Sequence, residues 1–142
     1  MKKKTVRNIL VIDDDPNMIR ILEKWLQNAG CRVWASLNGT EGIETAQREK
    51  PSLILLDLML PDIGGVEVAR RLREDQQTTD IPVLFMTVTM GVEIDKGDET
   101  MEIDGRLYRV FAKPLHRAKL LSEIRKSINR RLNKNPSSIE GS

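Results

Sequence analysis

The 142-residue sequence lacks several features that would assign it to a specialised class of protein. It has one cysteine, Cys31, so it cannot form an internal disulfide, and a reducing, cytoplasmic setting is the default expectation. The segment from Met1 to Lys4 leads directly into a short apolar run, so we expect neither a signal peptide nor a membrane span. The formal net charge of +2 is too small to indicate nucleic-acid binding by itself.

The composition also excludes a disordered or fibrous protein, because 39% hydrophobic and 31% charged residues are ordinary for a globular chain. A chain of 142 residues is long enough for one domain that folds unaided. We predict a single domain over residues 1–132. Residues 133–142 are rich in Asn, Ser, Pro and Gly, which is typical of a flexible linker or tail.

Short apolar runs alternate with amphipathic segments along the chain. The runs that predict strands are 8–12, 31–35, 52–56, 82–87 and 107–112. The segments with helical spacing of apolar residues are 16–29, 39–49, 66–72 and 115–128. This alternation predicts an α/β domain in which helices cover both faces of a parallel sheet.

Polar and charged residues stand where the predicted strands end. Asp13 and Asp14 follow the first strand and Asp57 follows the third, while Thr87 and Lys113 end the fourth and fifth. Ligands of open α/β sheets bind beyond the carboxyl ends of the strands, where the strand order reverses. The sequence does not reveal the order, but in the order 2-1-3-4-5 that point lies between the first and third strands, and these two end in aspartates.

The three aspartates predict a cation site. Two carboxylates about 4 Å apart repel each other by about 4 kcal/mol at an effective dielectric constant of about 20. An interpretation of Asp13 and Asp14 as ordinary loop residues leaves this repulsion unexplained, whereas Asp15 before Pro16 is interpreted as a helix N-cap. Oxygen ligands from a few carboxylates, completed by water, suit Mg²⁺ better than Ca²⁺.

The same residues suit phosphoryl transfer. A carboxylate nucleophile must meet a phosphoryl group that is itself negative, so a metal ion, an ammonium and a hydroxyl are needed to offset the charge. Asp57 is the candidate acceptor, and Lys113 and Thr87 are candidates for the other two positions. Lys113 alone would be interpreted as a solvated surface lysine; the aspartates and the following Pro114, which restricts the backbone, favour the site.

Four blocks of this sequence resemble the signature blocks of receiver domains of two-component response regulators. The blocks are Ile9–Pro16, Leu55–Pro61, Pro82–Thr87 and Lys113-Pro114, and the resemblance extends from about Arg7 to Asn129. It implies a flavodoxin-like (CheY-like), doubly wound, five-stranded parallel sheet of order 2-1-3-4-5.

The resemblance also implies a metal site and a function. Asp14, Asp57 and the Met59 carbonyl would bind Mg²⁺ directly, and Asp13 would act through water. Asp57 would receive its phosphoryl group from a histidine kinase or a histidine phosphotransfer protein.

Thr87 and Lys113 would then contact the phosphoryl group. Such a domain catalyses its own phosphorylation and slow dephosphorylation, so it is a signalling switch that changes its partner-binding surface and not a turnover enzyme. The downstream partner, a missing effector domain and the oligomeric state are left open.

Residues 88–107 depart from the family, which normally has a fourth helix here. Apolar and polar residues alternate over 88–94 and again around Met101 and Ile103, which is the strand period. Lys96-Gly97 and Asp104-Gly105 have turn composition, and the second is a strong hairpin signal. We predict extended strands in place of a full fourth helix; a poorly patterned helix with a frayed loop is the alternative.

Two single positions also depart from the family. Val88 stands where receivers usually have a small residue, which would restrict access to the phosphoryl site. Val110 stands where an aromatic switch residue is usual, and its neighbours Tyr108 and Phe111 are expected to face differently. These departures put the conventional output mechanism in doubt more than phosphorylation.

Three other functions are possible from the sequence. The first is a degenerate receiver that binds partners without being phosphorylated, and the second is a Mg²⁺-dependent phosphatase. The phosphatase would need a second carboxylate two residues after the nucleophile, where this chain has Met59. The third, a DNA-binding protein, has only a basic last helix in its favour, so we expect no direct nucleic-acid binding.

Overall fold

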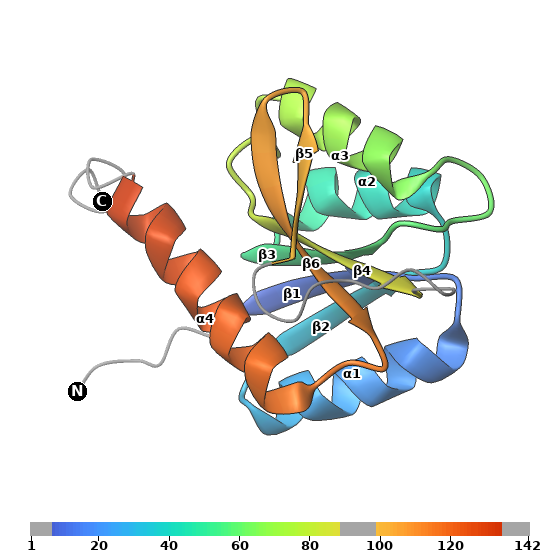
Figure 1. The fold of residues 1–142 in the computed structure, drawn as a ribbon, viewed down its shortest axis with the longest axis vertical. Helices are drawn as coiled ribbons and strands as arrows, with labels where there is room; N and C mark the ends of the chain where they lie inside the picture. The colour runs from blue at the N-terminus through green and yellow to red at the C-terminus, as the bar shows by residue number, and fades with distance from the viewer. Residues whose placement is uncertain (1–6, 89–98, 135–142) are drawn as a thin grey trace.

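The computed structural model describes residues 7–88 and 99–134 (Figure 1). Its strands are β1 (Asn8–Ile12), β2 (Arg32–Ser36), β3 (Leu53–Asp57), β4 (Val83–Val88), β5 (Thr100–Ile103) and β6 (Arg106–Lys113). Its helices are α1 (Pro16–Asn28), α2 (Gly39–Glu49), α3 (Gly65–Glu74) and α4 (Arg117–Lys134). None of the helices in these two ranges is both long and apolar enough to cross a membrane.

One six-stranded sheet runs through the domain in the order β2-β1-β3-β4-β6-β5. β2, β1, β3, β4 and β6 are parallel, and β5 adds an antiparallel edge strand to β6. The fifth strand expected from the sequence is β6, so the predicted order 2-1-3-4-5 is confirmed, with one additional strand at its edge.

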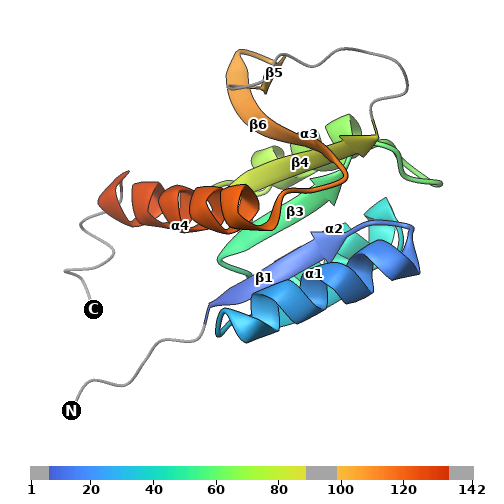
Figure 2. The same cartoon turned by 60° about the horizontal axis from the view of Figure 1, so that its bottom comes forward.

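Helices cover both faces of the sheet, as Figures 1 and 2 show. Ile9 and Val11 of β1 pack in a cluster with residues of α1 and α4, whereas Leu10 and Ile12 pack on the opposite face with residues of α2 and α3. All four side chains are fully buried, which explains why the strand is a continuous apolar run. Each such side chain contributes about 2 kcal/mol through burial.

The helix ends follow the local sequence signals. Asp15 Oδ1 accepts a hydrogen bond of 2.9 Å from the Asn17 N–H, and Asn38 Oδ1 accepts one of 2.8 Å from the Glu41 N–H. Asp15 was expected as an N-cap, and the spacing of Asn38 and Glu41 is that of a capping box in the sequence. α4 ends at Lys134, two residues beyond the predicted domain end at 132, and the linker prediction for the following residues stays a prediction.

The segment before β6 is a hairpin strand, as predicted. β5 pairs with the first half of β6 through a turn at Asp104-Gly105, whose φ values of 51° and 83° are both positive. Two positive values are what a tight hairpin turn requires, and Asp-Gly supplies them at low cost. Ile103 is buried and Met101 is partly buried on the same side, so the predicted alternation holds there. The predicted turn at Lys96-Gly97 lies outside the described residues.

α3 holds the hairpin in place. Arg70 Nε lies 2.9 Å from Asp104 Oδ2, and Arg73 donates hydrogen bonds of 3.3 Å to the carbonyls of Ile103 and Asp104. The hairpin thereby covers part of the sheet face on which α3 packs.

β6 places its aromatic residues on opposite faces of the sheet. Tyr108 packs edge-on against Phe85, with ring centroids 5.4 Å apart, and Val110 packs in the same cluster. Phe111 packs in the cluster on the other face. The expectation that Tyr108 would face differently from Val110 is therefore wrong, because residues two apart on a strand share a face.

Candidate functional site

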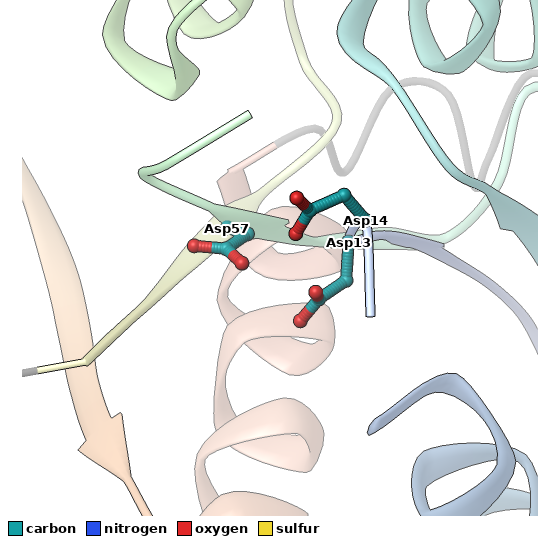
Figure 3. A group of neighbouring side chains, drawn as sticks. All are labelled: Asp13, Asp14 and Asp57. Atoms are coloured by element: carbon teal, nitrogen blue, oxygen red, sulfur yellow. The ribbon is translucent and has the colours of Figure 1, made fainter. Parts of the chain in front are cut away.

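Three carboxylates gather at the carboxyl ends of β1 and β3 (Figure 3). Oxygen atoms of Asp13, Asp14 and Asp57 all lie within 4.8 Å of one another. Ile12 pairs with Leu56 in adjacent parallel strands, so the residues that follow them, Asp13 and Asp57, are neighbours. Asp13 and Asp57 are buried, whereas Asp14 is exposed to solvent. The structure thus brings the predicted acidic residues together.

Lys113 joins the two buried carboxylates from the end of β6. Its Nζ lies 2.7 Å from Asp13 Oδ2 and 3.1 Å from Asp57 Oδ2, and only 11% of the side chain is exposed. The lysine reaches across β4 to Asp57 at the end of β3, and across β4 and β3 to Asp13 after β1. The alternative that Lys113 is a solvated surface lysine is excluded by this position.

Burial and neighbouring groups shift the pKa values of Asp57 and Lys113. Burial raises the pKa of Asp57 above its usual range, the Met59 N–H opposes this, and the Asp13 charge adds to it. For Lys113, burial acts to lower the pKa, but hydrogen bonds to Asp13 and Asp57 and their charges outweigh it, so its pKa is raised. Lys113 therefore stays protonated near neutral pH and offsets part of the carboxylate charge.

The backbone after Asp57 fits closely against the start of α3. The Met59 N–H donates a hydrogen bond of 3.0 Å to Asp57 Oδ1, and the Gly65 N–H donates one of 3.0 Å to the Leu58 carbonyl. A Cβ atom at Gly65 would lie 2.4 Å from the Asp57 carbonyl oxygen, so only glycine fits. No role for Gly65 was predicted from the sequence.

Asp62 connects the same loop to the N-terminus of α2. Its carboxylate accepts hydrogen bonds from the N–H groups of Gly39 and Thr40, both at 2.8 Å, and from the Thr40 hydroxyl at 2.7 Å. These three donors hold the pKa of the Asp62 carboxyl far below its usual range. The sequence carried no signal for this contact, because its partners are more than twenty positions away.

Thr87 lies beside the acidic cluster near the end of β4. Its predecessor Met86 pairs with Asp57 in the sheet, and its hydroxyl donates a 3.5 Å hydrogen bond to the Val88 carbonyl. Val88 pairs with Lys113 and is 52% exposed, so it lies at the rim of the site. Met59 is exposed at the rim as well.

The donor set fits a divalent cation. Three carboxylates face one ammonium, so the cluster carries two more negative than positive charges when all four groups are ionised. Within the described ranges, the Asp14 carboxylate makes no hydrogen bond or ion pair, so it is available as a ligand. An all-oxygen set with a solvent-exposed member suits Mg²⁺, which keeps several of its waters.

Comparison with known proteins identifies the family. Residues 9–125 match the family of the response regulator receiver domain. The chain is a receiver domain of the response-regulator family, as its sequence blocks and its fold both indicated.

Relatives from bacteria support this assignment. The chain is 35% identical over 122 residues to a DNA-binding dual master transcriptional regulator, RpaA, of Synechocystis. The match covers 86% of this chain and 49% of that protein. It is 33% identical over 133 residues to the response regulator ArlR of Staphylococcus saprophyticus, covering 94% and 57% of the two chains. The chain therefore spans about half the length of these relatives.

Solved structures share the fold. One is the receiver domain of a sensor histidine kinase from Pseudomonas aeruginosa, which has a magnesium ion coordinated in its active-site cleft. It superposes with a TM-score of 0.74 at 25% identity and covers 88% of this chain and 99% of its own. A CheY-like receiver domain protein from Methanospirillum hungatei gives a TM-score of 0.74 at 19% identity, with coverage of 92% and 99%.

Proposed function

We propose that Asp57 of this receiver domain accepts a phosphoryl group, and that Mg²⁺ bound beside it makes the transfer possible. The observation that carries the proposal is the position of Lys113, whose ammonium lies between the buried carboxylates of Asp13 and Asp57. A buried acceptor, an acidic pair and a lysine at one point are the groups that transfer to a carboxylate requires.

The proposed transfer is a nucleophilic substitution at phosphorus. An Asp57 carboxylate oxygen attacks the phosphorus of a phosphohistidine, an O–P bond forms and the P–N bond breaks. The imidazole leaves with the bond's electron pair and takes up a proton. Lys113 offsets charge on one phosphoryl oxygen, and the Thr87 hydroxyl donates a hydrogen bond to another after it turns from the Val88 carbonyl.

The metal would be held by Asp14, Asp57 and the Met59 carbonyl directly and by Asp13 through water. When bound, Mg²⁺ neutralises charge shared by the acceptor and the phosphoryl group. Asp13 also keeps Lys113 in place through their 2.7 Å contact, so it has a second role that needs no metal.

The partners follow from the same proposal. The donor is a histidine kinase or a histidine phosphotransfer protein. The output passes to a downstream protein or to an effector segment, since this chain spans about half of its relatives. The domain acts as a switch that resets by slow hydrolysis of its own acyl phosphate.

The test is modification of the acceptor by a small phosphodonor. With Mg²⁺ and acetyl phosphate, the intact mass of the wild type should rise by one phosphoryl group, and peptide analysis should place it on Asp57. Asp57→Asn should stay unmodified. Asp80→Asn, which removes the same charge at an exposed position far from the cluster, should be modified like the wild type. A wild type that stays unmodified at saturating Mg²⁺ would favour the phosphorylation-independent receiver.

A further inference from the structure

A cavity lies at the end of the sheet opposite Asp57. Its volume is about 230 Å³, and it is formed by the beginnings of β4 and β6 together with the C-terminal halves of α3 and α4. These elements can be followed in Figure 1. β4 lines it at Val83, and Thr87 is four residues further along, about 13 Å away at 3.3 Å per residue. The cavity is therefore distinct from the acidic site.

The walls of the cavity are strongly basic. Five arginines line it: Arg73, Arg106, Arg109, Arg130 and Arg131. Among the described residues, Glu123 forms ion pairs with Arg109 at 3.7 Å and with Arg130, and Asp80 lies in the wall. Arg73, Arg106 and Arg131 form no ion pair in the described ranges, so three guanidinium charges face the one carboxylate of Asp80, and an anionic ligand would offset the excess.

The inner surface of the cavity is apolar. Leu72, Ile81, Leu84 and Tyr108 are buried there, and Leu107 projects at the rim with 67% of its surface exposed. An inorganic anion would gain nothing from such a surface. A molecule with an organic body and an anionic group would use both the apolar wall and the arginines.

The hairpin preorganises the basic wall. Arg73 is held by the carbonyls of Ile103 and Asp104, and the Arg106 guanidinium lies 5.9 Å from the centre of the Tyr108 ring. Side chains that are already placed lose less conformational freedom when a ligand binds. The cavity thus owes part of its wall to the segment in which this chain departs from its family.

We propose that this cavity, the arginine pocket, binds a small organic phosphate of the size of a sugar phosphate or a mononucleotide. The guanidinium fork matches phosphate oxygens in paired hydrogen bonds, and the guanidinium groups of Arg73, Arg106 and Arg131 around one cavity favour this group over a neutral one. The volume, which is below that of sites for drug-sized ligands, favours a small molecule over a macromolecule. The proposal does not depend on phosphorylation of Asp57.

The test is titration of the intact, isotope-labelled chain with adenosine monophosphate, glucose 6-phosphate, inorganic phosphate and citrate. One of the two organic phosphates should produce saturable amide shifts at Arg106, Leu107 and Tyr108. Inorganic phosphate and citrate should each bind at least about tenfold more weakly. Inorganic phosphate has no organic body to contact the apolar wall, and citrate has no phosphate group to pair with the guanidinium groups.

Charge-matched variants identify the pocket. Arg106→Gln combined with Arg131→Gln should weaken binding of the better organic phosphate by about tenfold or more, since charge-assisted hydrogen bonds are lost. Arg32→Gln removes the same kind of charge from an exposed position on β2, at the other edge of the sheet, and should change affinity less than about twofold. Circular dichroism establishes that each variant is folded. If the double variant unfolds, the affinity of the single variant Arg131→Gln for the organic phosphate tests the proposal instead.

The proposal would be overturned if neither organic phosphate saturates the shifts below about 10 mM, a weak-binding limit, or if inorganic phosphate or citrate binds as tightly as the organic phosphates. It would also be overturned if Arg32→Gln weakens binding as much as the pocket variants do. Shifts around Asp13 and Asp57 instead of around β6 residues 106–108 would overturn it as well.

Discussion

The acceptor end of the sheet and its hairpin edge are built in different ways. At the acceptor end, defined by Asp13, Asp57 and Lys113, each functional side chain follows a parallel strand in the interior of the sheet. At the hairpin edge, defined by β5 and its turn to β6, the outer strand is four residues long and pairs only with β6. The residues of the proposed phosphoryl site thus follow central strands, whereas the hairpin lies at the edge of the sheet. We therefore expect changes at the hairpin edge to have little effect on the acceptor end.

The largest effect should come from Asp14, whose carboxylate is exposed and has no protein partner in the described ranges. Asp14→Ala should weaken Mg²⁺ binding by about a hundredfold or more and stop phosphorylation, because one of the few proposed direct ligands is lost. Isothermal titration with Mg²⁺ measures this. Asp15→Ala is the control: it removes a neighbouring carboxylate that caps α1, so it should cost about 1 kcal/mol of stability and leave Mg²⁺ affinity unchanged. Equal losses in both variants would contradict the assignment.

The next largest effect concerns the backbone that supports Asp57. Gly65→Ala would place a methyl group 2.4 Å from the Asp57 carbonyl oxygen, so we expect a loss of about 2–3 kcal/mol in unfolding free energy and slower phosphorylation. Gly64→Ala is a matched control, since a Cβ there meets nothing within 4 Å and φ is −66°. Urea denaturation compares the two. Equal stability of the variants would show that the acceptor loop is looser than the structure indicates.

At the hairpin edge, stability and phosphorylation should separate. Ile103→Ala removes a buried side chain and should cost about 2 kcal/mol of stability. The acetyl phosphate labelling rate should stay within about twofold, because Ile103 contributes nothing to the acidic cluster. Leu107→Ala, at an exposed position of the same hairpin, should change stability by less than about 0.5 kcal/mol. A large fall in the labelling rate of folded Ile103→Ala would show that the two ends are coupled.

The smallest effect is expected at Val88, at the end of β4 beside Lys113. Val88→Ala opens the rim opposite Lys113, so labelling by acetyl phosphate should become about twofold to fivefold faster, which is less than 1 kcal/mol in barrier height. Stability should be almost unchanged, since half of the side chain is exposed. Stopped-flow labelling of both proteins at equal Mg²⁺ gives the comparison. An unchanged or slower rate would mean that Val88 does not restrict access.

Local features of this protein were readable from its sequence because their physical causes are local. The apolar run of β1, the caps at Asp15 and Asn38, and the Asp104-Gly105 turn each depend on residues within a few positions. The aspartates could be placed at strand ends for the same reason. The family resemblance supplied the strand order and the ligand set that these patterns left open.

Only the tertiary structure decided how remote residues meet. Lys113 reaches Asp13 across one hundred positions, and the contact depends on the register of β6 against β4 and of β3 against β1. Gly65 is required because α3 begins against the Asp57 backbone, and Asp62, in the loop before α3, accepts its hydrogen bonds from the start of α2. The arginine pocket likewise needs the hairpin, α3 and α4 to pack together. Sequence periodicity indicates which face of an element is buried, whereas distances between elements follow from the packing of the whole core.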